Sequence, residues 1–229
     1  LNDPLFERSR LVFSDQGLIR LQKSHVLVAG VGGVGGFVCE ALARAGVGHL
    51  TLVDHDRVSP SNLNRQIVAL HSTQGESKVD VMRRRILDIN PTAQVTIIKE
   101  FLSPDAMPGL VAEGFDFIVD AIDSLNCKVA LVEQAVRQKV SVVSSMGAGR
   151  RVDPSKIEIA DISKTHGCGL ARAMRQRLKK QGIKKGVQVV FSTEIPKDPG
   201  PFEAIEGARG RVVNGTASYM PGIFGLMLA

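Results

Sequence analysis

The chain has 229 residues with 44% hydrophobic content, which is enough for one large α/β domain with a core of ordinary size. It has no run of ~18 apolar residues and no basic-then-apolar N-terminus, so we expect neither a membrane span nor a secretory signal. The three cysteines form no CxxC pair, which argues against a disulfide framework or a zinc site and favours a reducing, cytoplasmic location. A net charge of +6 is compatible with an anionic partner or with a solvated basic surface.

Strands and helices are expected to alternate along the chain. Apolar runs predict strands at 25–30, 49–54, 95–98, 115–119 and 140–143. Apolar residues at helical spacing predict helices at 33–45, 75–90 and 124–138. This order is typical of an α/β fold, a Rossmann-like, mostly parallel sheet with helices on both faces.

The pattern changes after Gly149. We expect a short strand at 157–160, a basic helix, a strand at 187–191, an exposed loop at 195–208 and an apolar C-terminal run at 222–229. The single domain of 1–229 would then consist of a nucleotide-binding half, 1–150, and an extended C-terminal half, 151–229, for substrate.

A glycine-rich turn follows the first predicted strand and opens a helix. The GxGxxG motif consists of Gly30, Gly32, Gly33 and Gly35. Glycines permit a tight turn and bring backbone N–H groups to phosphate at a helix N-terminus. Asp54 follows the second strand about 20 residues on, where a carboxylate can accept ribose hydroxyls. This motif alone is compatible with NAD as well as ATP.

Polar and charged residues after the second strand favour ATP. They are Asp56, Asn62, Arg65, Gln66 and Lys78. Singly, Arg65 or Lys78 is more typical of a solvated surface, but together they could neutralise the phosphates of ATP and the developing pyrophosphate. A nicotinamide oxidoreductase needs little positive charge here, and no acid or base for hydride transfer is recognisable.

Two aspartates follow the strand predicted at 115–119. They lie at the carboxyl edge, where open α/β sheets bind ligands. Asp123 could hold Mg²⁺ across the ATP phosphates. The alternative is a helix N-cap for 124–138, which Asp120 or Ser124 could supply equally well.

This set of motifs resembles the ThiF/MoeB/HesA superfamily, which is related to ubiquitin-activating enzymes. The resemblance covers about residues 5–149 and implies an adenylation domain that binds ATP and Mg²⁺ and adenylates a carboxylate. It implies phosphate binding by the glycine motif, ribose binding by Asp54, and stabilisation of the transferring phosphate by Arg65 and Lys78. By the same resemblance Asn62 and Gln66 would line the site, Asp56 would belong to it, and Asp123 would hold Mg²⁺.

The resemblance also implies a homodimer. In this superfamily an arginine near the N-terminus reaches the site of the other subunit. Arg10 is the expected match, with Arg8 as the near alternative.

The second half, together with some segments of the first, resembles one branch of the superfamily, the tRNA threonylcarbamoyladenosine dehydratases. The matching segments lie at 66–70, 147–149, 153–154, 161–165, 171–180 and 190–194. This resemblance implies ATP-dependent cyclisation of threonylcarbamoyladenosine in tRNA. It makes a basic segment the candidate tRNA contact: Arg172, Arg175, Arg177, Lys179, Lys180, Lys184 and Lys185. Otherwise this segment is a solvated helix face.

Two other functions compete with the tRNA reaction. Activation of a ubiquitin-like sulfur-carrier protein often accompanies paired CxxC zinc ligands and a catalytic cysteine. Neither CxxC is present, and Cys168, between two glycines, would need a nearby cation or helix N-terminus to act as a nucleophile. A regulator that only binds nucleotide would not need Arg10, Arg65, Lys78 and Asp123 together. Whether a cysteine-desulfurase and sulfur-acceptor system is a partner stays open.

Overall fold

The computed structural model describes residues 3–198, 200–205, 208–212 and 214–229, and its centre is a seven-stranded sheet. The strands are β1 (His25–Ala29), β2 (His49–Val53), β3 (Gln94–Ile98), β4 (Phe117–Asp120), β5 (Ser141–Ser145), β6 (Ile157–Asp161) and β7 (Gln188–Ser192). Their order is β3-β2-β1-β4-β5-β7-β6, and β6 pairs antiparallel with β7 whereas the other pairs are parallel. The expected mostly parallel sheet is therefore confirmed.

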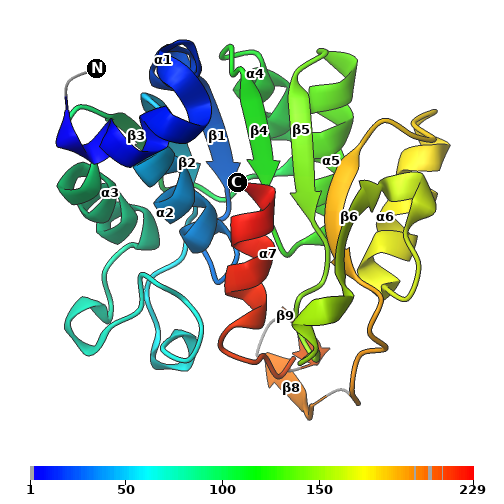
Figure 1. Cartoon of the computed structure of the whole chain (residues 1–229). Helices are drawn as coiled ribbons and strands as arrows, with labels where there is room; N and C mark the ends of the chain where they lie inside the picture. Colours follow the sequence, from blue (N-terminus) through cyan, green and yellow to red (C-terminus); the bar gives the residue numbers. More distant parts are fainter. Residues whose placement is uncertain (1–2, 199, 206–207, 213) are drawn as a thin grey trace.

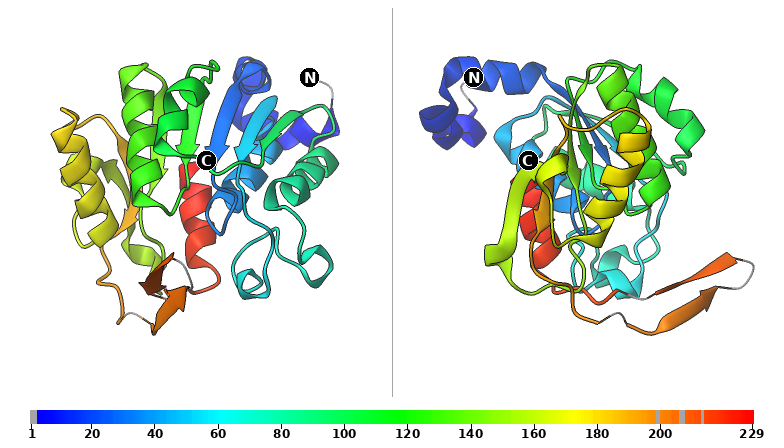
Figure 2. Two further views of the ribbon diagram at one scale, coloured as in Figure 1. Left: turned by 180° about the vertical axis from the view of Figure 1, so that it is seen from behind. Right: turned by 90° about the vertical axis from the view of Figure 1, so that its right-hand side faces the viewer.

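Helices cover both faces of the sheet, as the alternating pattern predicts (Figures 1 and 2). One face carries α2 (Gly35–Ala45), α3 (Lys78–Ile89) and α7 (Met220–Leu228), and α1 (Glu7–Lys23) lies on the same side. The other face carries α4 (Met107–Val111), α5 (Leu125–Arg137) and α6 (Gly169–Lys180). Parallel neighbours need such crossover helices, and apolar clusters between sheet and helices form the core on each face.

Several segments differ from the sequence expectations. The helix α1 is absent from the predicted elements, because its apolar residues are largely exposed and Ser14, with φ 61°, interrupts its helical backbone. The C-terminal apolar run is the helix α7. The prediction of an exposed loop at 195–208 is wrong from Phe202 on, because β8 (Phe202–Ile205) pairs antiparallel with β9 (Ala208–Val212). Residues 206 and 207 lie outside the described part of the chain.

The C-terminal half joins the same sheet as the N-terminal half. The strand β7 pairs with β5, and α7 packs between α2 and the strands β5 and β7. None of the helices in the described ranges is long and apolar enough to cross a membrane.

Candidate active site

The candidate site lies where the chain changes direction across the sheet. From β1 the chain continues outward to β2 and β3, and it then crosses back to form β4 on the other side of β1. Loops that leave β1 and β4 therefore diverge at the carboxyl edge, which is the usual ligand site of an open α/β sheet. The register places Ala29, at the end of β1, beside Asp120, at the end of β4.

The glycine motif turns sharply from β1 into α2. Gly30 has φ 91°, and a Cβ there would lie 2.7 Å from the carbonyl oxygen of Ala121. A Cβ on Gly35 would lie 1.8 Å from the carbonyl oxygen of Gly30, so this turn requires glycine at both positions. Among the described residues, no acceptor bonds the N–H groups of 32–35. Such free N–H groups at a helix N-terminus form an anion site.

Asp54 holds the two loops that follow β1 and β2. Its carboxylate accepts the N–H of Val31 at 2.7 Å and that of Asp56 at 2.8 Å. Lys78, at the start of α3, is buried and donates from Nζ to the Asp56 carboxylate at 2.7 Å. Because Asp56 is about half exposed, one face of this ion pair is open to a ligand.

The segment 62–66 packs directly on the glycine turn. A Cβ on Gly33 would lie 3.4 Å from Cγ of Arg65, and one on Gly32 would lie 3.8 Å from Nε2 of Gln66. The Arg65 guanidinium donates to the carbonyl of Ser61 at 2.9 Å, and burial lowers the pKa of Arg65 from its ordinary value. Arg65 and the buried Gln66 therefore lie against the glycine turn, and the buried Asn62 begins the same segment.

The two aspartates after β4 have different environments. Asp120 is fully buried and accepts hydrogen bonds from Lys128 at 2.7 Å and from Ser144 at 2.5 Å. Asp123 is exposed, with no hydrogen bond or ion pair among the described residues. Ser124 is the N-cap residue of α5, as one alternative from the sequence predicted, although its side chain makes no capping hydrogen bond. Asp120 does not cap the helix, because it bonds within the core.

Acidic and aromatic side chains also gather after β2. Potential ligand atoms of Asp54, His55 and Asp56 lie within 4.8 Å of one another, and Asp123 is not in this group. The ring of His55 meets that of Phe101 edge-on at 5.2 Å, beside the expected ribose position. Sequence inspection misses both rings because Phe101 follows β3, which only the sheet order brings next to β2.

The C-terminal helix also reaches the site. A Cβ on Gly33 would lie 3.1 Å from Pro221, in the first turn of α7. The sequence contains no signal for this contact, because about 190 residues separate the two and only tertiary packing joins them.

Arg10 lies away from the glycine turn of its own chain. The ring of Phe6, which precedes α1, packs against Gly46, the residue after α2. The glycine turn is at the other end of this 11-residue helix, which is about 16 Å long. Figure 1 shows α1 at the opposite end of the sheet from the loops after β1 and β2. Arg10 forms an ion pair with Asp15 at 2.8 Å.

The basic segment divides into exposed residues and one that is bonded to the protein. Arg175 donates to the carbonyl of Thr165 at 2.9 Å and to its hydroxyl at 2.5 Å. The six exposed cations are Arg172, Arg177, Lys179, Lys180, Lys184 and Lys185.

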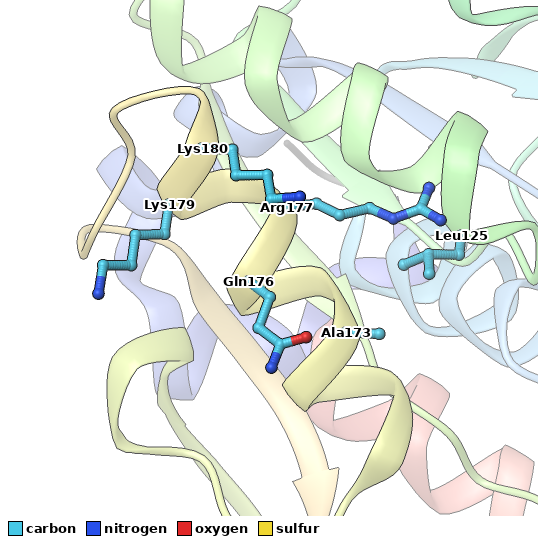
Figure 3. A pocket seen from close by; sticks show the side chains of 6 residues that line it. All are labelled: Leu125, Ala173, Gln176, Arg177, Lys179 and Lys180. Atoms are coloured by element: carbon cyan, nitrogen blue, oxygen red, sulfur yellow. The ribbon is translucent and has the colours of Figure 1, made fainter.

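Some of these cations line a shallow hollow of about 670 Å³ between α5 and α6 (Figure 3). Leu125 and Ala173 are its apolar lining, and Arg177 extends across it toward Leu125. Arg177 also bonds Asn126, three residues after Asp123, so this basic surface adjoins the turn that carries Asp123.

The cysteines are all buried in the described structure. Cys168 is the N-cap residue of α6, which meets the helix condition for an activated thiol. Its side chain is only 5% exposed, however, so a substrate could not reach the sulfur without movement of the surrounding loops.

The chain is similar to known proteins over most of its length. The ThiF family model matches residues 6–229. The tRNA threonylcarbamoyladenosine dehydratase of Bacillus subtilis (strain 168) is 42% identical over 97% of this chain and 91% of its own length. The enzyme of that name from Escherichia coli (strain K12) is 40% identical over 80% of this chain and 71% of its own.

Solved structures of an Escherichia coli tRNA N6-threonylcarbamoyladenosine dehydratase are also similar. The complex with ATP has a TM-score of 0.86 at 35% identity, covering 97% of this chain and 89% of that one. The complex with AMP has a TM-score of 0.87 at 36% identity, covering 96% and 89%. The chain belongs to the ThiF family.

Proposed function

We propose that this protein is an ATP-dependent tRNA threonylcarbamoyladenosine dehydratase, which adenylates the threonyl carboxylate of the modified nucleoside and closes it to a ring. The similarity over nearly the whole chain to enzymes of that name carries the proposal. The free N–H groups at the start of α2 and the cations beside them support ATP as the co-substrate.

The reaction has two steps. The threonyl carboxylate attacks the α-phosphorus of ATP, the bond to the β-phosphate breaks, and pyrophosphate leaves. An atom of the nucleoside's own carbamoyl group then attacks the acyl carbon, and AMP and a proton leave. The two steps together remove one water from the nucleoside. An internal nucleophile held close needs no enzyme thiol, and proximity of this kind can lower the barrier by several kcal/mol.

The chain's own residues position and stabilise the nucleotide. The N–H groups of 32–35 bind phosphate oxygens, and Asp54 accepts a ribose hydroxyl. Lys78 and Arg65 stabilise charge that develops on the transferring phosphate and on pyrophosphate. Because Asp56 already pairs with Lys78 at 2.7 Å, the ammonium group is oriented before ATP arrives.

Asp123 is the residue that would hold Mg²⁺. A hard cation prefers carboxylate oxygens, and the Asp123 carboxylate is exposed with no protein partner in the described structure. When bound, Mg²⁺ neutralises phosphate charge.

The tRNA is proposed to lie on the exposed cations of α6 and of the turn after it. This surface adjoins the turn that carries Asp123, through the contact of Arg177 with Asn126. Phosphate contacts of this kind position a nucleic acid without reading its sequence. Arg175 is left out of the proposed contact, because its guanidinium is bonded to Thr165.

A homodimer would complete the site. Arg10 is too far from the glycine turn of its own chain to act there, so we infer that it serves the partner subunit. Leu11 and Val12, next to it on α1, are 80% and 77% exposed, which fits a surface that a second copy covers.

We further infer one domain over 1–229, with 151–229 as its substrate half, and a cytoplasmic location where tRNA occurs.

The test is mass spectrometry of nucleosides from tRNA that carries threonylcarbamoyladenosine, after incubation with the protein, Mg²⁺ and ATP. We expect loss of one water from that nucleoside only when ATP is present. An unchanged nucleoside, with AMP formed only after addition of a carrier protein that ends in Gly-Gly, would instead assign the chain to sulfur-carrier activation.

A further inference from the structure

A polar cluster is buried beneath the turn that carries Asp123. Its three members are fully buried: Asp120, Lys128 and Ser144. Lys128 Nζ lies 2.7 Å from Asp120 Oδ2 and 3.4 Å from the Ser144 hydroxyl, which itself donates to Oδ2 at 2.5 Å. The cluster joins β4, α5 and β5 at the carboxyl edge.

The other carboxylate oxygen of Asp120 shapes the turn itself. Oδ1 accepts the N–H of Ile122 at 3.1 Å, one residue before Asp123. The N–H of Ala121 donates to the carbonyl of Ala29 at 2.8 Å, so the same turn lies against the end of β1. Rotation of the Asp120 side chain would therefore change the path of the backbone that leads to Asp123.

Stability alone is a weak reason for this cluster. Replacing a buried ion pair by apolar residues of similar volume is often neutral or stabilising, because desolvation of two charges offsets their attraction. The neighbouring residues of α5 that face the core, Cys127 and Leu131, are apolar. A lysine at this position is therefore better explained by the geometry that it imposes on Asp120.

We propose that Lys128 is a positioning residue, which with Ser144 holds the Asp120 carboxylate and thereby places Asp123 to bind nucleotide-bound Mg²⁺. This inference rests on the proposed function. Partners that orient a metal ligand from behind typically contribute about 10–100-fold to metal affinity or activity.

The test compares the affinity for an ATP analogue with and without Mg²⁺. Calorimetry with AMPCPP, whose α–β linkage cannot be cleaved, is run in MgCl₂ and in EDTA, and the ratio of the two affinities is the readout. We expect Lys128→Met to lower this ratio about tenfold and Ser144→Ala to lower it less, while the affinity in EDTA changes little. Among the described residues Lys128 bonds Asp120 and Ser144, and no hydrogen bond joins it to the glycine turn or to Asp54, which are proposed to bind the nucleotide without metal.

A second variant separates an effect through Asp120 from a direct one. In Asp120→Asn the side chain keeps an oxygen that can accept the N–H of Ile122. It has no negative charge, so it does not need Lys128 as a counter-ion. The double variant Asp120→Asn/Lys128→Met should therefore recover most of the Mg²⁺ effect that Lys128→Met removes. If the ratio stays as low as in Lys128→Met, Lys128 acts directly and the inference is overturned.

Val132→Ala is the control for reduced stability. Val132 is buried on the same helix but belongs to the apolar cluster formed with α6, so the affinity ratio of Val132→Ala should equal that of the wild-type protein. An unchanged ratio in folded Lys128→Met and Ser144→Ala would also overturn the inference. Failure of the ATP-binding part of the proposed function appears differently, as wild-type protein that does not bind AMPCPP, and failure of its tRNA part appears only in the nucleoside assay.

Discussion

The polar residues at the candidate site differ in how many hydrogen bonds and ion pairs they form with other groups of the protein. Asp120 is fully bonded inside the core, whereas Asp123, three residues later, has no partner among the described residues. Lys78 is intermediate, since it pairs with a half-exposed Asp56. Groups with unused capacity at a ligand edge are available for substrate, and groups that are fully bonded shape the site.

Asp123→Ala should abolish catalysis while leaving the fold intact. Because the Asp123 carboxylate has no partner in the described part of the chain, its removal should not lower the melting temperature measurably. We expect ATP–pyrophosphate exchange to fall by about 100-fold or more, since a group that organises charge in the transition state is removed. Full exchange in the folded variant would remove Asp123 from the mechanism. Asp105→Ala is the matched control, because Asp105 is also an exposed aspartate. Asp116 is unsuitable for this purpose, because its carboxylate accepts a hydrogen bond from the backbone N–H of His25.

At the scale of single elements, α6 combines a packing face with a charged face. Ala171, Met174 and Leu178 are buried at helical spacing. The exposed Arg172 and Arg177 lie between them in the sequence, and Lys179 and Lys180 follow. This pattern explains why the helix forms whether or not it binds nucleic acid. The contact of Arg177 with α5 gives the charged face its place beside the candidate site.

Neutralising the exposed face of α6 should weaken tRNA binding and its dependence on salt. In Arg172→Gln/Lys179→Gln/Lys180→Gln we expect the slope of log affinity against log salt to become shallower by about 0.7–0.9 for each phosphate that the protein no longer neutralises. The affinity for ATP should not change. Filter binding of tRNA at several salt concentrations measures the slope.

Two cations of α3 supply the matched control for charge. Arg83 and Arg84 are exposed on a helix of the opposite face of the sheet, so Arg83→Gln/Arg84→Gln should keep the salt slope of the wild-type protein. An equal decrease of slope in both variants would indicate that net charge, rather than the surface of α6, binds the tRNA.

At the scale of the whole molecule, two features lie far from the glycine turn but affect the entire protein. The helix α1 presents exposed apolar residues together with Arg10. At the start of β1 and β2, the rings of His25 and His49 stack with centroids 3.5 Å apart. The first feature concerns assembly and the second concerns folding stability.

Mixing two inactive variants tests whether the site is shared between subunits. Arg10→Ala and Lys78→Ala should each be inactive, but a heterodimer would contain one site with both native residues. Equal mixing of freely exchanging C₂ dimers should therefore restore about one quarter of the wild-type exchange rate. If activity does not return although subunit exchange is demonstrated, Arg10 does not act across a dimer.

The stacked histidines should make the protein less stable in mild acid. Burial lowers the pKa of His25, the neighbouring His49 lowers it further, and Asp116 opposes the shift; burial also lowers the pKa of His49. In the unfolded chain a histidine has a pKa of about 6.5, which is higher than its lowered pKa in the folded protein. The pair's contribution to the free energy of unfolding is therefore fully present above that pH and is lost as the pH falls below it.

The melting temperature between pH 8 and pH 5 is the measurement for this pair. Since both rings are partly exposed, we expect the pair to account for no more than a few degrees of the decrease on acidification. The melting temperature of His49→Gln should fall less over the same range. An identical decrease in the variant and the wild-type protein would show that other groups cause the acid sensitivity.

Local patterns in the chain are sufficient to predict the α/β class, the parallel strands up to β5 and the glycine turn, and they point to Arg65 and Gln66, which pack against that turn. They are sufficient because strand and helix periodicity and a GxGxxG turn depend on neighbouring residues. The helix α1 is not predicted because its apolar residues face outward, and the pairing of β8 with β9 is not predicted because no strong alternation marks it.

Which residues at the carboxyl edge are free to react depends instead on tertiary contacts. Asp120 and Asp123 are alike in the sequence, and they differ because α5 and β5 bring Lys128 and Ser144 to one of them alone. In the same way, the fold brings Pro221 to the glycine turn and separates Arg10 from it. Burial and the choice of partners depend on contacts between segments distant in the chain, which local patterns do not contain.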